Sequence, residues 1–170
     1  EPIEEWVAPY YHRINGESDK LEFDNIADEY DYTKLEKDLD WFQRPINEGN
    51  RWTEPYWDKA GKTYMITYSS VFYNAKDSIK NKETALGVVT IDISMDYIKN
   101  IIENIDLGAS GFGALVSRQG IYLYHPNTEY VVAQKTIIEV AEEKNDRNRL
   151  IMAEKAAKGE GGILDHISTT

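Results

Sequence analysis

The 170-residue sequence contains no cysteine. This absence excludes disulfide bonds, thiolate catalysis and cysteine-ligated zinc. Basic residues are also scarce, because 19 Lys and Arg stand against 30 Asp and Glu and the formal net charge is -11. Nucleic acid and anionic membrane surfaces are therefore unfavourable partners, since both require basic side chains to neutralise phosphates.

Long apolar runs are missing as well, and no segment approaches the ~20 residues needed to span a bilayer. The chain begins at Glu1 without a signal-peptide pattern, so we interpret it as a piece of a longer protein. Aromatic residues, by contrast, are abundant, with 12 Tyr and 4 Trp. Aromatic rings combined with excess carboxylate favour cationic ligands.

The distribution of apolar and aromatic residues predicts an α+β fold with antiparallel sheets. The expected strands lie at 6–13, 63–73, 86–93, 112–117 and 121–124. The expected helices lie within 30–49, at 95–106 behind an N-cap at Ser94, and at 140–157.

Residue clusters typical of enzymes are not found in the sequence. His12, His125 and His166 lie far apart, and none has the spacing of a metal-binding pair. Gly111 and Gly113 follow a predicted helix and lack the Gly-Lys-Ser/Thr of a phosphate loop, and no G-x-S-x-G motif is present. The sequence therefore favours a binding protein with no enzymatic activity, cofactor or metal.

Most of the functional information lies in an acidic and aromatic run between residues 40 and 92. Asp92 interrupts an apolar strand and shares one face with Thr90 and Ser94, which is either a solvated outer face or the floor of a pocket. Tyr64 and Tyr68 share a strand face, where they either pack as a pair or form the wall of a cavity.

The order and spacing of several short motifs resemble a double Cache sensor domain, the extracytoplasmic part of histidine kinases, chemoreceptors and membrane-bound phosphatases. The matching segments are Asp-Trp-Phe at 40–42, W-T-E-P-Y-x-D at 52–58, the strands at 64–69 and 87–94, the glycine-rich segment 111–117, Gly120 and His125-Pro126.

The resemblance implies two PAS-like modules in tandem, each an antiparallel sheet flanked by helices. We expect the membrane-distal, ligand-binding module at 1–94, and the linking helix with the start of the membrane-proximal module at 95–170. The family pattern also has a long helix before the first strand and further strands after residue 170, and we expect both to be missing from this chain.

In amino-acid-binding members of this family, an Arg two residues before a Trp-aromatic pair holds the ligand carboxylate. Here Trp41 and Phe42 match that pair, but Leu39 stands at the Arg position and cannot bind a carboxylate. A Tyr and two Asp hold the ligand ammonium in those members, and the matching residues here are Tyr56, Asp58 and Asp92. Asp40 adds a carboxylate, as in members that resemble amine sensors.

The resemblance thus predicts a periplasmic or cell-surface sensor domain that binds a small amine or amino-acid-like ligand. Membrane anchoring would come from segments absent from this chain, and a homodimer is expected. The expected ligand-binding residues are Asp40, Trp41, Phe42, Tyr56, Asp58, Tyr64, Tyr68 and Asp92. Two alternatives stay open: an amino-acid or carboxylate sensor that uses Arg44 or Arg51, and a protein-interaction module with the aromatic residues packed as core.

Overall fold

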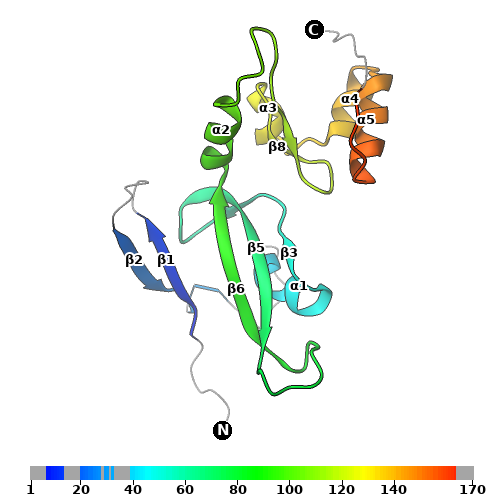
Figure 1. Ribbon diagram of the computed structural model, residues 1–170. Coiled ribbons are helices and arrows are strands. Elements are labelled where there is room, and N and C mark those ends of the chain that lie inside the picture. The colour runs from blue at the N-terminus through cyan, green and yellow to red at the C-terminus, as the bar shows by residue number, and fades with distance from the viewer. Residues whose placement is uncertain (1–6, 14–19, 28, 31, 33–38, 164–170) are drawn as a thin grey trace. The chain divides into compact units, whose positions relative to one another are not determined.

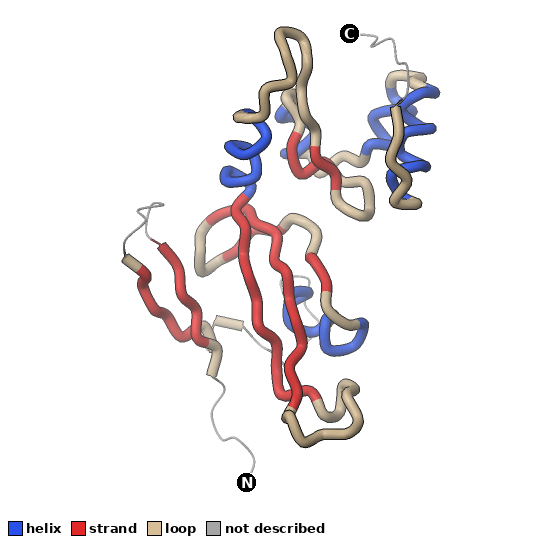
Figure 2. Tube along the Cα trace, in the orientation of Figure 1, coloured by secondary structure: helices blue, strands red, loops and turns tan. Residues whose placement is uncertain are grey.

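The computed structural model describes residues 7–13, 20–27, 29, 30, 32 and 39–163 (Figure 1). The chain divides into two compact units, unit 1 (Glu1–Asp92) and unit 2 (Ile93–Thr170), and each is considered by itself. Unit 1 is built mainly of strands and unit 2 mainly of helices (Figure 2). The expected module boundary between residues 94 and 95 lies close to this division.

Unit 1 holds a sheet of four strands and a separate two-stranded hairpin. The strands of the sheet are β3 (Arg51–Trp52), β4 (Tyr56–Asp58), β5 (Thr63–Tyr73) and β6 (Ala85–Ser94). Strands β3 and β4 pair antiparallel with successive stretches of β5, and β6 also pairs with β5. The two long strands confirm the sequence prediction, because their β-branched and aromatic residues suit a half-buried pleated surface.

The hairpin consists of β1 (Pro9–Arg13) and β2 (Leu21–Asn25), paired antiparallel. The expected strand at 6–13 is confirmed from Pro9 onwards, and Trp6 lies outside the described residues. Strand β2 was not predicted. Its sequence, Leu-Glu-Phe-Asp-Asn, is short and mostly exposed, so it carries little of the burial pattern from which strands are recognised.

Alternate residues of β5 point to opposite sides of the sheet, and both sides include buried residues, since Ile66 on the side of Tyr64 and Tyr68 is 8% exposed. Met65, Thr67 and Ser69 are buried and define what we call the inner face. Tyr64 and Tyr68 point to the opposite, outer face, where their rings contact those of Trp57 and Trp52 at centroid distances of 5.3 and 5.2 Å.

Helix α1 (Asp40–Glu48) is attached to the inner face by a hydrogen bond that follows from its sequence. Pro45 lies inside the helix and has no N–H, so the carbonyl of Trp41 loses its usual partner four residues on. That carbonyl instead accepts a hydrogen bond from the Ser69 hydroxyl at 2.6 Å. The helix begins next to Leu39, which is fully buried and forms a core with Tyr30 and Ile26.

Unit 2 contains one short hairpin and four helices among its described residues. These elements are α2 (Met95–Glu103), β7 (Leu115–Val116), β8 (Tyr122–Tyr124), α3 (Thr128–Val132), α4 (Ile137–Glu143) and α5 (Arg147–Ala157). Ser94 caps α2 as predicted, since its hydroxyl accepts a hydrogen bond from the Tyr97 amide at 3.2 Å.

The single helix expected at 140–157 is wrong, because the structure has two helices there, α4 and α5. Asn145 adopts a left-handed conformation with φ of 52°, which ends the helical path. Asp146 then caps α5 by accepting a hydrogen bond from the Arg149 amide at 3.0 Å. Residues 142–149 contain no apolar side chain, so no change in apolar spacing marks where one helix ends and the next begins.

Candidate ligand-binding site

Asp58 and Asp92 bring two carboxylates to the same part of unit 1. Asp58 ends β4 with only 5% of its surface exposed. It accepts hydrogen bonds from the Tyr30 hydroxyl at 3.0 Å and from the Gly61 amide. A side chain at Gly61 would meet both the Asp58 carboxylate and the Tyr10 hydroxyl at about 3 Å, so the turn can approach this closely only with glycine.

A line of hydroxyl groups leads across the inner face to Asp92. The Thr67 hydroxyl donates to Asp92 Oδ1 at 2.8 Å, and it lies 2.7 Å from the Tyr56 hydroxyl. Because the single Thr67 proton is used towards Asp92, Tyr56 must donate to Thr67. Thr67 is 1% exposed, and the path runs through it from Tyr56 to Asp92, both of which are partly buried.

Asp92 is held in a setting that disfavours its charge. Burial raises the pKa of Asp92, the hydrogen bond from Thr67 lowers it, and the nearby charge of Asp58 raises it further, with a net upward shift. A carboxylate with this environment gains from a cation placed beside it, because an opposite charge favours the ionised form.

Three phenols surround the two carboxylates. Burial raises the pKa of Tyr10, Tyr30 and Tyr56, and the charge of Asp58 raises all three further. The charge of Asp92 acts in the same direction on Tyr10 and Tyr56. Each hydroxyl therefore stays protonated at physiological pH, and those of Tyr30 and Tyr56 donate their protons to Asp58 and Thr67.

Aromatic rings from α1 continue this site. The Trp41 ring meets the Tyr30 ring edge-on at 5.9 Å, and the Phe42 ring meets that of Tyr32 at 5.1 Å. The Lys59 ammonium lies 5.7 Å from the centre of the Tyr30 ring, so a cation already uses one of these aromatic surfaces.

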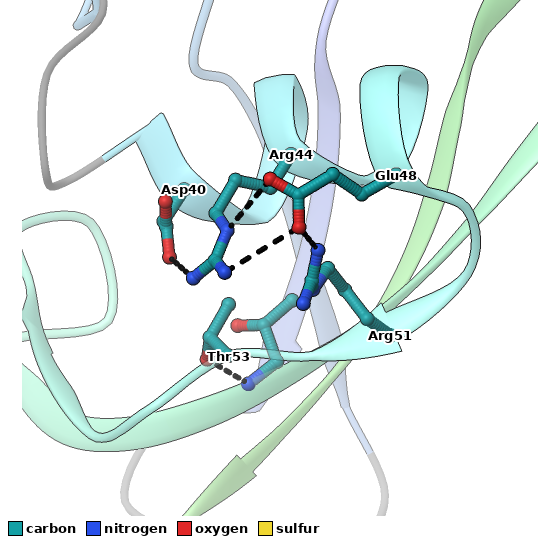
Figure 3. Close-up of polar contacts among 6 residues, drawn as sticks. Asp40, Arg44, Glu48, Arg51 and Thr53 are labelled. Atoms are coloured by element: carbon teal, nitrogen blue, oxygen red, sulfur yellow. Dashed lines mark hydrogen bonds and ion pairs between the residues drawn. The ribbon is translucent and has the colours of Figure 1, made fainter. Parts of the chain in front are cut away.

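Asp40 takes part in a separate network of ion pairs on α1 (Figure 3). Arg44 Nη1 lies 3.1 Å from Asp40 Oδ2, and its Nη2 lies 3.4 Å from Glu48 Oε2. Arg51 pairs with the same Glu48 carboxylate. Both arginines that could replace the missing carboxylate-binding Arg are therefore engaged with carboxylates of the protein itself.

The structure thus brings five of the expected site residues to the inner face or to the aromatic cluster joined to it: Trp41, Phe42, Tyr56, Asp58 and Asp92. Tyr64 and Tyr68 lie instead on the outer face, where Tyr64 is 52% exposed. Asp40 is engaged by Arg44. The solvated-face interpretation of Asp92 fails, because Ile91 on the other face is 63% exposed while Asp92 is mostly enclosed.

Sequence reasoning missed Tyr10, Tyr30 and Thr67. Thr67 carried a usable signal, since it lies in the predicted strand next to β6 and has a hydroxyl on a face otherwise used for burial. Tyr10 and Tyr30 lie 82 and 62 positions before Asp92, and no local pattern connects them to it.

Neither a metal-binding cluster nor a membrane-spanning helix is present among the residues that the structure describes. Those residues contain no group of three or more His, Asp or Glu side chains arranged to hold a metal ion. In the same residues, no helix has both the length and the apolar character needed to cross a bilayer.

A comparison with known families matches residues 2–100 to the first PDC sensor domain of proteins like methyl-accepting chemotaxis proteins. This match covers more than half of the sequence. The chain belongs to this family. It is a PDC sensor domain, of the type that chemoreceptors carry on their extracellular side, and the Cache resemblance is confirmed.

Relatives of this PDC sensor domain occur in bacteria and animals. The methyl-accepting chemotaxis protein McpG of Pseudomonas putida is 25% identical over 131 residues, which are 76% of this chain and 19% of that protein. The voltage-dependent calcium channel subunit alpha-2/delta-2 of Homo sapiens is 31% identical over 80 residues, 45% of this chain and 7% of that protein. The chain therefore spans a small part of the curated relatives it matches.

Solved structures show the same fold. The extracellular domain of the putative histidine kinase mmHK1S-Z3 superposes with a TM-score of 0.60 at 20% identity, covering 91% of this chain and 49% of that one. The ligand-binding domain of the Pseudomonas fluorescens chemoreceptor CtaA, in complex with L-valine, gives 0.52 at 22% identity over 79% of this chain and 55% of that one. The α+β, PAS-like architecture expected from the sequence is therefore confirmed.

Proposed function

We propose that this PDC sensor domain binds a small organic amine at the inner face of unit 1 and is not an enzyme. The observation that carries the proposal is the pair of enclosed carboxylates, Asp58 and Asp92, whose negative charges act on each other. An ammonium group between them would relieve that repulsion and supply hydrogen-bond donors to the Asp92 oxygens.

The aromatic groups support an amine over a metal ion. Tyr30 and Trp41 present rings next to the carboxylates, and a cation–π contact contributes roughly 0.5–2 kcal/mol. A hydrogen bond to a charged carboxylate adds about 1.5–3 kcal/mol. Two contacts of each kind contribute about 4–10 kcal/mol before the cost of association, which corresponds to roughly millimolar binding.

The engaged arginines argue against a sensor that holds a ligand carboxylate. Arg44 and Arg51 are bound by Asp40 and Glu48, and releasing either would break an existing ion pair. Leu39, at the position expected to carry the arginine, is fully buried in the core. We therefore favour a ligand that has an ammonium group and needs no carboxylate.

In the whole receptor, this chain would be the extracytoplasmic ligand-sensing part, and membrane anchors would come from segments outside it. Relatives such as McpG are methyl-accepting chemotaxis proteins, which supports a role in signal transduction. Ligand binding shifts a receptor only if the two signalling states differ in affinity. We expect the receptor to act as a homodimer.

Calorimetry on the full chain tests the proposed ligand class. The panel should contain primary amines, the amino acids derived from them, carboxylates without an amino group, and sugars. The proposal predicts binding of amines, with affinity retained when the ligand carboxylate is removed. Binding of carboxylates or sugars alone would contradict it.

A further inference from the structure

Unit 2 contains a partly buried arginine whose hydrogen-bonding capacity is only partly used. Arg149 lies in the first turn of α5, and its side chain is 17% exposed. Its Nε lies 3.4 Å from Oδ2 of Asp146, the residue that also caps the helix, and its side chain is hydrogen-bonded to that of Tyr122. Its Nη1 is buried and has no hydrogen-bond partner. A buried charged donor without an acceptor is costly, so this guanidinium lacks part of the anionic environment that it needs.

Aromatic and imidazole rings lie beside this guanidinium. The His125 ring contacts the rings of Tyr122, Tyr130 and Phe112 at centroid distances of 5.0, 4.8 and 5.5 Å. Burial raises the pKa of Tyr122 and lowers that of His125, and the charge of Arg149 acts on both groups. The side-chain hydrogen bond between Arg149 and Tyr122 places the cluster directly beside the guanidinium.

The hydrogen bonding of His125 leaves a donor for such a ligand. His125 Nδ1 accepts a hydrogen bond from the Asn127 amide at 2.9 Å, so the neutral ring carries its proton on Nε2. Phe112, at the edge of the cluster, is exposed and marks the side that faces solvent.

We propose that unit 2 has a binding site of its own, in which Arg149 and the cluster of Tyr122, His125 and Tyr130 hold a small monocarboxylate. A guanidinium fork matches the two oxygens of a carboxylate, and the rings accommodate a planar or apolar body. Asp146 already offsets part of the Arg149 charge, and this balance suits one negative charge better than the two of a phosphate. This site goes beyond the amine site of unit 1 and does not depend on it.

Binding to the full chain should be measured by calorimetry with benzoate, pyruvate and acetate as probes. Benzamide serves as the neutral counterpart of benzoate, and inorganic phosphate serves as the dianion. The proposal predicts binding of at least one monocarboxylate with a dissociation constant of about 1 mM or tighter, and none of benzamide. Failure of all three monocarboxylates, or equal binding of benzamide, would overturn the proposal, as would stronger binding of phosphate.

Variants then locate the site. We expect Arg149→Gln to lower carboxylate affinity at least tenfold and Arg149→Lys to lower it less, because lysine keeps the charge and loses the fork. Arg147→Gln, an exposed change on the same helix, is the matched control and should leave binding unchanged. Asp92→Asn should also leave it unchanged, which separates this site from that of unit 1. Unchanged carboxylate affinity in folded Arg149→Gln would refute the assignment.

A second measurement does not require a variant to fold. The ring resonances of His125 can be followed by NMR in the wild-type chain as the carboxylate is added. A bound anion should raise the pKa of His125, because a negative charge favours the imidazolium. A carboxylate that binds without moving this titration would place the ligand elsewhere and contradict the proposal.

Discussion

The Thr67 hydroxyl links the two halves of the proposed amine site, and its removal gives a prediction with a definite magnitude. Thr67→Val keeps the shape of the side chain but leaves the Tyr56 hydroxyl and Asp92 Oδ1 without the bonds they make at 2.7 and 2.8 Å. A bond to a carboxylate contributes about 1.5–3 kcal/mol and a neutral bond about 0.5–1.5 kcal/mol. We therefore expect the free energy of unfolding to fall by about 2–4.5 kcal/mol.

Thr67→Ser is the matched control, because it keeps the hydroxyl and removes one buried methyl group, a loss of about 1 kcal/mol. Urea unfolding of the wild type and both variants measures the difference. A double-mutant cycle with Tyr56→Phe should show a coupling energy of about 0.5–1.5 kcal/mol between the two hydroxyls. If Thr67→Val costs no more than Thr67→Ser, the hydroxyl path does not contribute to stability and the reasoning fails.

Three further predictions concern other parts of the chain. Burial, with the charges of Arg149 and Lys144, lowers the pKa of His125 below 6.5. The free energy of unfolding should therefore decrease as the pH falls below about 6.5, because the unfolded chain then binds the proton more tightly. Urea unfolding at a series of pH values should show this decrease, and His125→Gln should remove it. Leu39→Ala should cost about 2–5 kcal/mol in the same assay, because Leu39 is fully buried, and a loss below 1 kcal/mol would contradict its core position. Tyr64→Leu should leave amine affinity unchanged in calorimetry, because Tyr64 lies on the outer face, and a clear loss would place that face at the ligand.

Much of the fold could be predicted from local patterns. The bounds of β5 and β6, the Ser94 cap and the hairpin in unit 2 follow from residue types that act over a few positions. The break between α4 and α5 was also encoded locally, by Asn145 and Asp146, but it lies in the charged stretch 142–149, where no apolar spacing reveals it.

The site was harder to predict, because it depends on which faces meet. Alternation placed Tyr64 and Tyr68 together, but it cannot say which side of the sheet is covered. In this sheet the polar face of β6, with Asp92, turns inward, and the apolar face with Val89 and Ile91 turns outward. In most sheets the apolar face is buried and the polar face is exposed, and here the opposite holds for β6. An argument from hydrophobicity alone therefore assigns the tyrosines to the wrong face. Tyr10 and Tyr30 can be assigned to the site only from the three-dimensional structure, because both lie far from Asp92 in the sequence.

The central claim is that enclosed carboxylates of unit 1 hold an amine, and amine binding to Asp92→Asn tests it most directly. Asparagine can still accept the Thr67 hydrogen bond but carries no charge, so the amine found by the panel should bind roughly 10- to 150-fold more weakly, equivalent to about 1.5–3 kcal/mol. Asp96→Asn, an exposed change, is the control and should bind like the wild type. Equal affinity of Asp92→Asn and the wild type would contradict the account.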